Sequence, residues 1–389
     1  MSKAHRKLGR RLRLGVIGGG PDSFIGSIHR SAATMHEEFD VVAGVFSSNP
    51  ERSIAAGKAM GIARPYGDPD ALFAGEANVD DPIDALAIMT PNNSHYILSI
   101  RALDAGFNVF CEKPLTMTEE ESADLVKRVK AAGKRYCVAY GYSGYPMVRE
   151  AKELVAQGVI GNITMVQSNY VQGHLATLTD SELSGSNWHM KPELAGPSLI
   201  LGDIATHSYH LASYVMGMEA ASLSADVTAV VEGRTADDYC GILLRYPNNA
   251  RGVFWVTQAA AGGVHGLNVT LHGTKGGIEW HQEQPNELRV KPLDQPAYVL
   301  TKGGVGLTAA GERVSHVAIG HPEGYREAFA NLYYDFASNI VDDILGETPN
   351  PLTLCNPTVE DGAYGMAFVY AAVRSSENDG KWEPLKNLT

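Results

Sequence analysis

The chain has 389 residues, of which 44% are hydrophobic and 20% are charged. This composition is ordinary for a globular protein and excludes a disordered or fibrous chain. The length predicts two domains, with one large domain as the alternative. No apolar run approaches the roughly 18 residues that a membrane helix needs. The basic, polar opening segment 1–13 is not typical of a signal peptide, so we expect neither feature.

The formal net charge of −12 disfavours nucleic acid as a partner, because an acidic surface is repelled by phosphates. Basic residues are nevertheless concentrated in the first thirteen positions. We expect residues 1–12 to form a solvated, frayed N-terminal tail, with an anion-binding arm as the alternative. These basic residues are Lys3, Arg6, Lys7, Arg10, Arg11 and Arg13.

The four cysteines are widely spaced and include no CxxC pair, which argues against a structural zinc site and against a disulfide framework. We expect buried, inert thiols in a reducing cytoplasm. The cysteines are Cys111, Cys137, Cys240 and Cys355.

Short apolar runs alternate with helical patterns over the first 140 residues. Continuous apolar runs are typical of strands that are covered on both faces, and alternation with helices predicts right-handed crossovers in a parallel sheet. We therefore expect an α/β domain over residues 13–143. Its predicted strands are 14–17, 41–46, 85–89, 109–111 and 136–140, and a helix is predicted over 119–132.

After about residue 150 the pattern changes to longer segments with apolar/polar alternation. This pattern predicts a second domain over 144–389, built on a large, mostly antiparallel sheet with one face packed against helices. The predicted strands are 163–171, 225–231, 240–246, 251–258 and 267–271, with a hairpin break at 247–249, and the predicted late helices are 324–345 and 358–374.

A glycine-rich loop follows the first predicted strand. Gly18, Gly19 and Gly20 are followed six residues later by Gly26, and a helical pattern comes next. This arrangement is typical of a dinucleotide site, where glycines allow a tight turn, close approach to a pyrophosphate and close helix packing. The usual spacing would place the third glycine at position 23, so we expect Gly26 to replace it. A plain glycine turn is the alternative; for a nucleotide, the expected contacts from this loop are Gly18, Gly20, Phe24 and Ile25.

The end of the second predicted strand lacks the carboxylate that normally binds the adenosine ribose. Ser47 and Ser48 stand there instead, and Arg52 lies just beyond. Hydroxyls and a guanidinium suit a 2′-phosphate, so we expect NADP to be accepted or preferred. A serine turn with an exposed arginine is the alternative.

Two polar segments follow the third and fourth predicted strands. Residues 90–95 read TPNNSH, and residues 111–114 read CEKP. Ligands bind at the carboxyl ends of parallel strands, and Pro114 biases Lys113 toward an extended conformation that can project its side chain. A surface turn is the alternative for this lysine.

Asp203 and His207 are four residues apart, so on a helix they would share one face. An imidazole can take the proton from a hydroxyl as hydride leaves its carbon, and a neighbouring carboxylate can orient it. A capping aspartate and a core histidine are the alternative. With His210 the pair could offer three metal ligands, but no second segment has zinc-site spacing, and we expect no metal.

The glycine loop, TPNNSH, CEKP and GDIATH (202–207) occur in this order over nearly the whole chain. Together they resemble the glucose–fructose oxidoreductase, inositol dehydrogenase and rhizopine-catabolism family (Gfo/Idh/MocA). The resemblance implies an N-terminal Rossmann domain and a C-terminal α/β domain whose open sheet often forms the interface of a homodimer or homotetramer. It also implies hydride exchange between NAD(P) and a sugar or cyclitol carbinol, without a metal.

By the same resemblance, Lys113 would contact the reacting hydroxyl and the nicotinamide ribose, Asp203 would hold the substrate, and His207 would be the general acid/base. Thr90, Pro91, Asn92, His95 and Glu112 would serve the cofactor site. The sequence departs from the family in its longer glycine loop, in the missing ribose carboxylate and in residues 140–142, where relatives often carry a G-F/Y-N-x-R-like run.

Residues 188–193 (WHMKPE) resemble the family's W-R-x-D-P-like loop, with Lys191 near the position of the arginine. The Trp188 face would stack on a sugar ring, and an ordinary packed tryptophan is the alternative. His321 could reach a polyol or belong to a capping loop. Tyr142 is a further candidate, and Tyr145 and His174 are weaker ones.

Three functions remain open from the sequence. The first is an NAD(P)-dependent sugar or cyclitol dehydrogenase. The second is a glycosidase of the same fold that retains its cofactor and cycles hydride. The third is a sugar-sensing regulator without catalysis, against which the intact Lys113, Asp203 and His207 argue.

Overall fold

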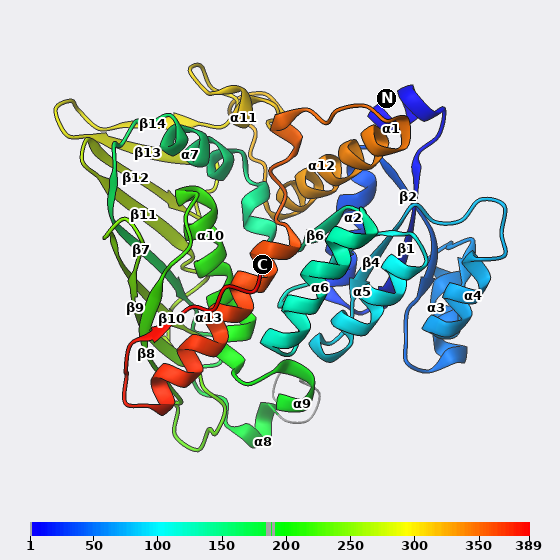
Figure 1. Ribbon diagram of the computed structural model, residues 1–389, viewed down its shortest axis with the longest axis horizontal. Coiled ribbons are helices and arrows are strands. Elements are labelled where there is room, and N and C mark those ends of the chain that lie inside the picture. Colours follow the sequence, from blue (N-terminus) through cyan, green and yellow to red (C-terminus); the bar gives the residue numbers. More distant parts are fainter. Residues whose placement is uncertain (1, 184–187, 189–190) are drawn as a thin grey trace. The chain divides into compact units, whose positions relative to one another are not determined.

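The computed structural model describes residues 2–183, 188 and 191–389, which form two compact units. The first unit contains the chain up to Thr116, residues 120–144 and residues 325–362. The second unit contains residues 117–119, 145–324 and 363–389. Figure 1 shows the elements of both units in chain colours.

A six-stranded parallel sheet forms the centre of the first unit, with strand order β3-β2-β1-β4-β5-β6. All five residues of β4 are buried, as expected for a strand that is covered on both faces. The predicted parallel α/β domain is therefore confirmed, although no apolar run indicated the short β3. The strands are β1 (Leu12–Gly18), β2 (Phe39–Val45), β3 (Arg64–Pro65), β4 (Ala85–Met89), β5 (Asn108–Cys111) and β6 (Tyr136–Val138).

The strand order reverses direction between β1 and β4, which pair with each other. In open α/β sheets this reversal opens a crevice at the carboxyl ends of the two strands, where ligands bind. The helices of this unit are α1 (Lys3–Leu8), α2 (Phe24–Met35), α3 (Pro50–Ala59), α4 (Pro69–Glu76), α5 (His95–Asp104), α6 (Glu119–Ala132) and α12 (Tyr325–Leu345), with 3₁₀ turns at Asn92–Ser94, Gly141–Gly144 and Pro351–Thr353.

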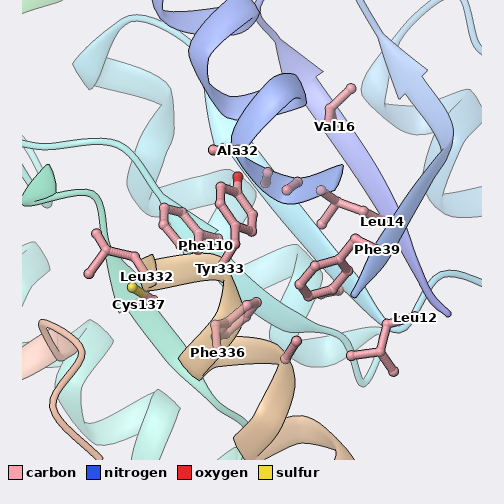
Figure 2. Close-up of a cluster of buried hydrophobic side chains, with 14 of the residues drawn as sticks. Leu12, Leu14, Val16, Ala32, Phe39, Phe110, Cys137, Leu332, Tyr333 and Phe336 are labelled. Carbon is pink, nitrogen blue, oxygen red and sulfur yellow. The ribbon is translucent and has the colours of Figure 1, made fainter. Parts of the chain in front are cut away.

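Helix α12 packs with α2 in the first unit, although it comes from the last quarter of the chain. Tyr333 of α12 stacks on Phe110 of β5 with ring centroids 4.1 Å apart, and Phe336 lies beside Phe39 in the same buried cluster (Figure 2). The expected single domain over 144–389 therefore needs a correction. The expected boundary agrees with the junction at Gly144, but the apolar face of α12 returns residues 325–362 to the first unit.

The N-terminal segment is not the frayed tail that its charge predicted. Residues 3–8 form α1, and β1 already begins at Leu12. The Nζ of Lys3 lies 2.5 Å from Asp342 of α12, and Arg10 makes a two-pronged contact with Asp84 at 2.7 and 2.8 Å. Acidic partners within the unit thus order the basic cluster, which composition alone could not reveal.

The second unit is built on a nine-stranded sheet with the order β14-β13-β12-β11-β7-β10-β9-β8-β15. All its neighbouring strands are antiparallel except β7 and β10, so the predicted mostly antiparallel sheet is confirmed. The strands are β7 (Ile163–Val171), β8 (Ser222–Thr228), β9 (Tyr239–Arg245), β10 (Arg251–Thr257), β11 (Asn268–Gly273), β12 (Gly276–His281), β13 (Glu287–Pro292), β14 (Tyr298–Thr301) and β15 (Glu383–Pro384).

Helices cover one face of this sheet, and α7 and α10 pack directly on its strands (Figure 1). Residues alternate between buried and exposed along β9 and β10, as a sheet with one covered face requires. In the described part of the chain, no helix has the length and apolarity that a membrane crossing needs. The helices of this unit are α7 (Pro146–Ala156), α8 (Asp180–Leu183), α9 (Pro192–Ala195), α10 (Thr206–Met216), α11 (Ala309–Glu312) and most of α13 (Val359–Glu377).

Candidate active site

The glycine loop joins β1 to α2 at the strand-order reversal. Gly18 has a φ of +90°, and a Cβ there would lie 2.3 Å from the carbonyl oxygen of Met89 on β4. A Cβ on Gly26 would lie 2.4 Å from the Cα of Gly19. Gly26 therefore allows the close helix packing expected of the third glycine, and the longer loop keeps the backbone cradle of a dinucleotide site.

The other residues predicted in this loop have different environments. A Cβ on Gly20 would meet the carbonyl oxygen of Phe46 at 2.7 Å, so this position also needs glycine. Phe24 is 72% exposed and stacks loosely on Tyr325, with ring centroids 6.5 Å apart. Ile25 instead packs against the buried core cluster, so its side chain supports α2 rather than facing open solvent. Among the predicted side chains of this loop, Phe24 has the surface that a ligand could cover.

Polar groups at the end of β2 order the turn into α3. Asn49 caps α3 by accepting a hydrogen bond from the backbone N–H of Arg52, and Ser47 Oγ accepts one from the N–H of Asn49. Ser48 and Arg52 are exposed. Ser48 and Arg52 thus present a hydroxyl and a guanidinium, which suit a 2′-phosphate, although the exposed Glu51 carboxylate also lies in the first turn of α3.

The segment after β4 is held by His95 at the start of α5. Its Nδ1 lies 2.8 Å from the carbonyl oxygen of Pro114, and its Nε2 lies 2.9 Å from that of Thr90. The ring is fully buried, so the expectation that His95 lines the cofactor channel needs a correction. Its role is to join the loop after β4 to the loop after β5.

Both ring nitrogens of His95 face carbonyl oxygens, and only the doubly protonated ring can donate to both. Burial alone would lower the pKa of His95, but the neighbouring Cys111 and the two carbonyl acceptors together raise this pKa to about 9. Beside it, Asn92 is buried, Pro91 is half-buried, and the Thr90 hydroxyl accepts a 2.6 Å hydrogen bond from Ser94.

Glu112 follows β5 and is almost completely buried. Its carboxylate lies 2.9 Å from Nε2 of His29 on α2 and accepts the backbone N–H of Lys113 at 3.1 Å. Burial would raise the pKa of Glu112, but the hydrogen bond and charge of His29, together with Lys113, lower it. Lys113 itself is half-buried. The sequence analysis missed His29, whose partner Glu112 is 83 residues away.

In the second unit, Asp203 lies in a π-helical turn, Leu201–Ala205, that leads directly into α10. Asp203 and His207 were expected on one regular helix, and this expectation needs a correction because the helix type changes between them. Such π-turns are frequent at functional sites. His207 is 8% exposed, and its ring lies 6.4 Å from that of Tyr170 on β7.

Gln258, which the sequence analysis did not select, holds Asp203. Its side-chain Nε2 donates to Oδ2 of Asp203 at 2.7 Å, and the residue is 2% exposed. The backbone N–H of Gln258 donates to the carbonyl oxygen of Asp238, whose carboxylate pairs at 2.9 Å with the fully buried Arg234. Asp203 is thus tied to a rigid part of the sheet.

Asp237 anchors the segment that precedes the π-turn. Its carboxylate accepts the hydroxyl of Ser198 and, at 2.8 Å, the backbone N–H of Leu199. Burial raises the pKa of Asp237, and these hydrogen bonds oppose that shift.

The remaining predicted substrate residues are dispersed. Tyr142 is buried beside Tyr325 in the first unit. Trp188 is half-buried, and its carbonyl oxygen accepts the N–H of the exposed Lys191, which precedes α9. His189 and Met190 lie outside the described residues. Of the other candidates, His174 and His321 are exposed, and Tyr145 is buried and accepts a hydrogen bond from Gln282.

The described residues contain no group of three or more His, Cys, Asp or Glu side chains that could hold a metal ion. His210, the third ligand considered with Asp203 and His207, packs against the ring of Tyr214.

Two family models match the chain. Residues 12–140 match the model described as the oxidoreductase family with an NAD-binding Rossmann fold, and residues 148–279 match the GFO/IDH/MocA C-terminal domain.

Three similar proteins cover most of the chain. The uncharacterized oxidoreductase YfiI of Bacillus subtilis is 32% identical over 99% of this chain and 100% of its own length. Levoglucosan dehydrogenase of Pseudarthrobacter phenanthrenivorans is 31% identical over 72% of this chain and 76% of its own length. The crystal structure of an inositol dehydrogenase homolog with NAD+ from Azotobacter vinelandii is 34% identical, with a TM-score of 0.91 over 96% of this chain and 97% of that one.

Proposed function

Since this chain belongs to the GFO/IDH/MocA family of NAD-binding oxidoreductases, we propose that it transfers a hydride between a nicotinamide cofactor and a secondary hydroxyl or ketone of a sugar, sugar derivative or inositol. The observation that carries the proposal is that the two units together contain each group that the reaction needs: a nucleotide-binding loop, a cation, a carboxylate and an imidazole. The first unit offers a glycine cradle and Lys113 at the ends of parallel strands, and the second offers an anchored Asp203 beside His207.

In the proposed reaction Lys113, Asp203 and His207 act on one carbinol. The nicotinamide, when bound, accepts the hydride from carbon. The His207 imidazole takes the hydroxyl proton as the hydride leaves, and the Lys113 ammonium stabilises the developing negative charge on oxygen. Asp203, fixed by Gln258, accepts a hydrogen bond from the substrate and orients it. Reduction of a ketone reverses the same steps.

We propose a polyol as the substrate class. Levoglucosan dehydrogenase and the inositol dehydrogenase homolog are named for a sugar derivative and a cyclitol, and both are similar to this chain over most of its length. A panel of sugars, anhydrosugars and inositols with NAD and NADP tests the proposal through NAD(P)H absorbance. Accumulation of reduced cofactor supports a dehydrogenase, whereas glycoside cleavage without net NAD(P)H would favour the hydride-cycling glycosidase.

For the cofactor, we propose that NADP is accepted in addition to NAD. Residues 46–49 after β2 contain no carboxylate, and the exposed Ser48 and Arg52 offer a hydroxyl and a guanidinium to a 2′-phosphate. The NAD-binding family model and the NAD+-bound homolog support the nicotinamide dinucleotide itself.

The uncovered face of the nine-stranded sheet is proposed as the interface of a homodimer or homotetramer. Val253 and Trp255 of β10 are each 47% exposed, and Leu243, which pairs with Val253, is 51% exposed. Neighbouring apolar side chains on one sheet face are typical of a surface that another subunit covers. We also propose a reducing cytoplasm as the working compartment, because none of the four cysteines, all of which lie in the described residues, forms a disulfide.

A further inference from the structure

A histidine in the first unit connects two distant helices to the loop that carries Lys113. His29 lies on α2 and is 1% exposed. Its Nε2 is 2.9 Å from Oε1 of Glu112, and its Nδ1 is 2.7 Å from the hydroxyl of Tyr333 on α12. The other carboxylate oxygen, Oε2 of Glu112, accepts the backbone N–H of Lys113 at 3.1 Å.

We propose that Tyr333, His29 and Glu112 form a buried relay that positions Lys113, with His29 as a positioning residue for the proposed hydride transfer. The inference rests on the proposed function, because it assigns Lys113 a role at the reacting carbinol.

The hydrogen-bond roles in the relay follow from the chemistry of its members. An ionised carboxylate only accepts, so Nε2 of His29 carries a proton and donates it to Glu112. Nδ1 of the same ring is hydrogen-bonded to the Tyr333 hydroxyl, which can donate or accept. Each member therefore fixes the orientation of the next one.

Packing leaves the His29 ring little freedom. Phe110 and Phe329 contact it edge-on, with ring centroids 5.5 and 5.2 Å away. A carboxylate buried in such surroundings is costly unless it is hydrogen-bonded. The titratable groups that face Glu112 are His29 from α2, Tyr333 from α12 and the adjacent Lys113. Of these, His29 supplies the hydrogen bond that favours the ionised form of Glu112, which accepts the Lys113 N–H more strongly than a neutral carboxyl would.

The test compares His29→Met with His29→Gln. Methionine fills space but cannot donate, whereas the glutamine amide can reach Glu112 in place of Nε2. His29→Met is expected to lower kcat/KM by about 10-fold to 100-fold, the usual effect of losing a hydrogen bond to a charged group. Loss of His29 is expected to raise the pKa of Glu112, so the variant protonates this carboxyl at a pH where the wild type keeps it ionised. The ratio of wild-type to variant activity is therefore expected to grow as pH falls. His29→Gln is expected to retain most of the activity.

The same helix pair offers a matched control. His36, which directly follows α2, packs on Tyr334 of α12, with ring centroids 5.7 Å apart. His36→Met is expected to leave kcat/KM and its pH profile unchanged. Should His29→Met fail to fold, Tyr333→Phe removes only one hydroxyl and is expected to lower kcat/KM by about 3-fold to 10-fold, again more strongly at acidic pH.

Denaturant unfolding gives a readout that needs no substrate. His29→Met is expected to destabilise the protein more at pH 7.5 than at pH 5, because protonation of Glu112 removes the unpaired charge. Effects that do not change with pH, or a His29→Gln variant as impaired as His29→Met, would overturn the relay. Wild-type protein without activity on any polyol would instead overturn the proposed function and leave the unfolding test of the relay in force.

Discussion

Gln258 donates its side-chain amide to the Asp203 carboxylate across 2.7 Å. In the described part of the chain its other amide atom, Oε1, is buried without a hydrogen-bond partner. The opposite amide orientation would place that oxygen against the Asp203 oxygen, so the contact assigns Asp203 Oδ2 the role of acceptor. A candidate substrate-binding carboxylate is thereby held in one orientation.

Gln258→Glu tests this contact with an isosteric change. At low pH the new carboxyl at position 258 and the carboxyl of Asp203 share one proton. The new group can then donate this proton to Asp203, as the Gln258 amide does in the wild type. Loss of that proton places two negative charges face to face. We expect kcat/KM of the variant to fall as pH rises, relative to the wild-type protein. Gln258→Met, which has no titratable group, is expected to be impaired equally across the range. A Gln258→Glu profile that parallels the wild type would contradict the assigned contact.

Replacing His207 tests the proposed acid/base group. His207→Ala is expected to lower kcat by roughly 10²-fold to 10⁴-fold, the usual range when a general acid or base is removed. NADH affinity, measured by fluorescence titration, is expected to stay unchanged because the glycine cradle lies in the other unit. Full turnover in this variant would exclude the assigned role.

His95 predicts a pH dependence of stability. Its pKa is raised from 6.5 to about 9, so its stabilising effect is fully present below about pH 6.5 and is lost as pH rises through 9. The maximal contribution is on the order of 3 kcal/mol. Urea unfolding of the wild type and of His95→Gln should show a difference in free energy at pH 6.5 that shrinks by pH 9.5. A constant difference would contradict a protonated ring.

Arg52 tests the NADP proposal. Arg52→Ala is expected to raise the KM for NADP by about 10-fold and to leave that for NAD unchanged, because only NADP offers a phosphate to the guanidinium. Lys58→Ala, an exposed cation on the same helix, serves as the control. Equal effects of Arg52→Ala on both cofactors would argue against a 2′-phosphate contact.

If the exposed apolar face of the nine-stranded sheet is a subunit interface, a charge placed on it should dissociate the oligomer. Trp255→Lys places a charge among neighbouring apolar side chains and is expected to shift the mass measured by light scattering toward the monomer. Val305→Lys, at an exposed loop residue, is expected to have no such effect. A wild-type protein that is already monomeric would refute the proposed interface.

Local sequence patterns predicted the elements whose apolar residues follow a continuous run or a regular helical spacing. The run 85–89 was predicted as a strand with the bounds that β4 has, and the helix over 119–132 coincides with α6. Gly26 was identified because close helix packing tolerates no side chain there, and the structure agrees. Such features depend on neighbours in sequence or on one rule of backbone sterics.

Features that depend on distant partners could not be predicted in this way. The ordering of residues 3–8 depends on Asp342, and the placement of α12 depends on its apolar fit to α2 and β5. His29 and Gln258 were missed because their partners, Glu112 and Asp203, are 83 and 55 residues away. His95 was assigned to the cofactor channel because its position in the motif does not reveal which carbonyl groups surround it.

The central claim is hydride transfer from a polyol carbinol, and the mass of the reduced cofactor tests it most directly. The wild-type enzyme would be incubated with NAD or NADP and polyols from the panel that carry deuterium on their carbinol carbons. The account predicts reduced cofactor that contains one deuterium from the substrate, and little product from Lys113→Met or His207→Ala. Absence of reduced, deuterium-labelled cofactor with every polyol, from protein that binds NADH, would contradict it.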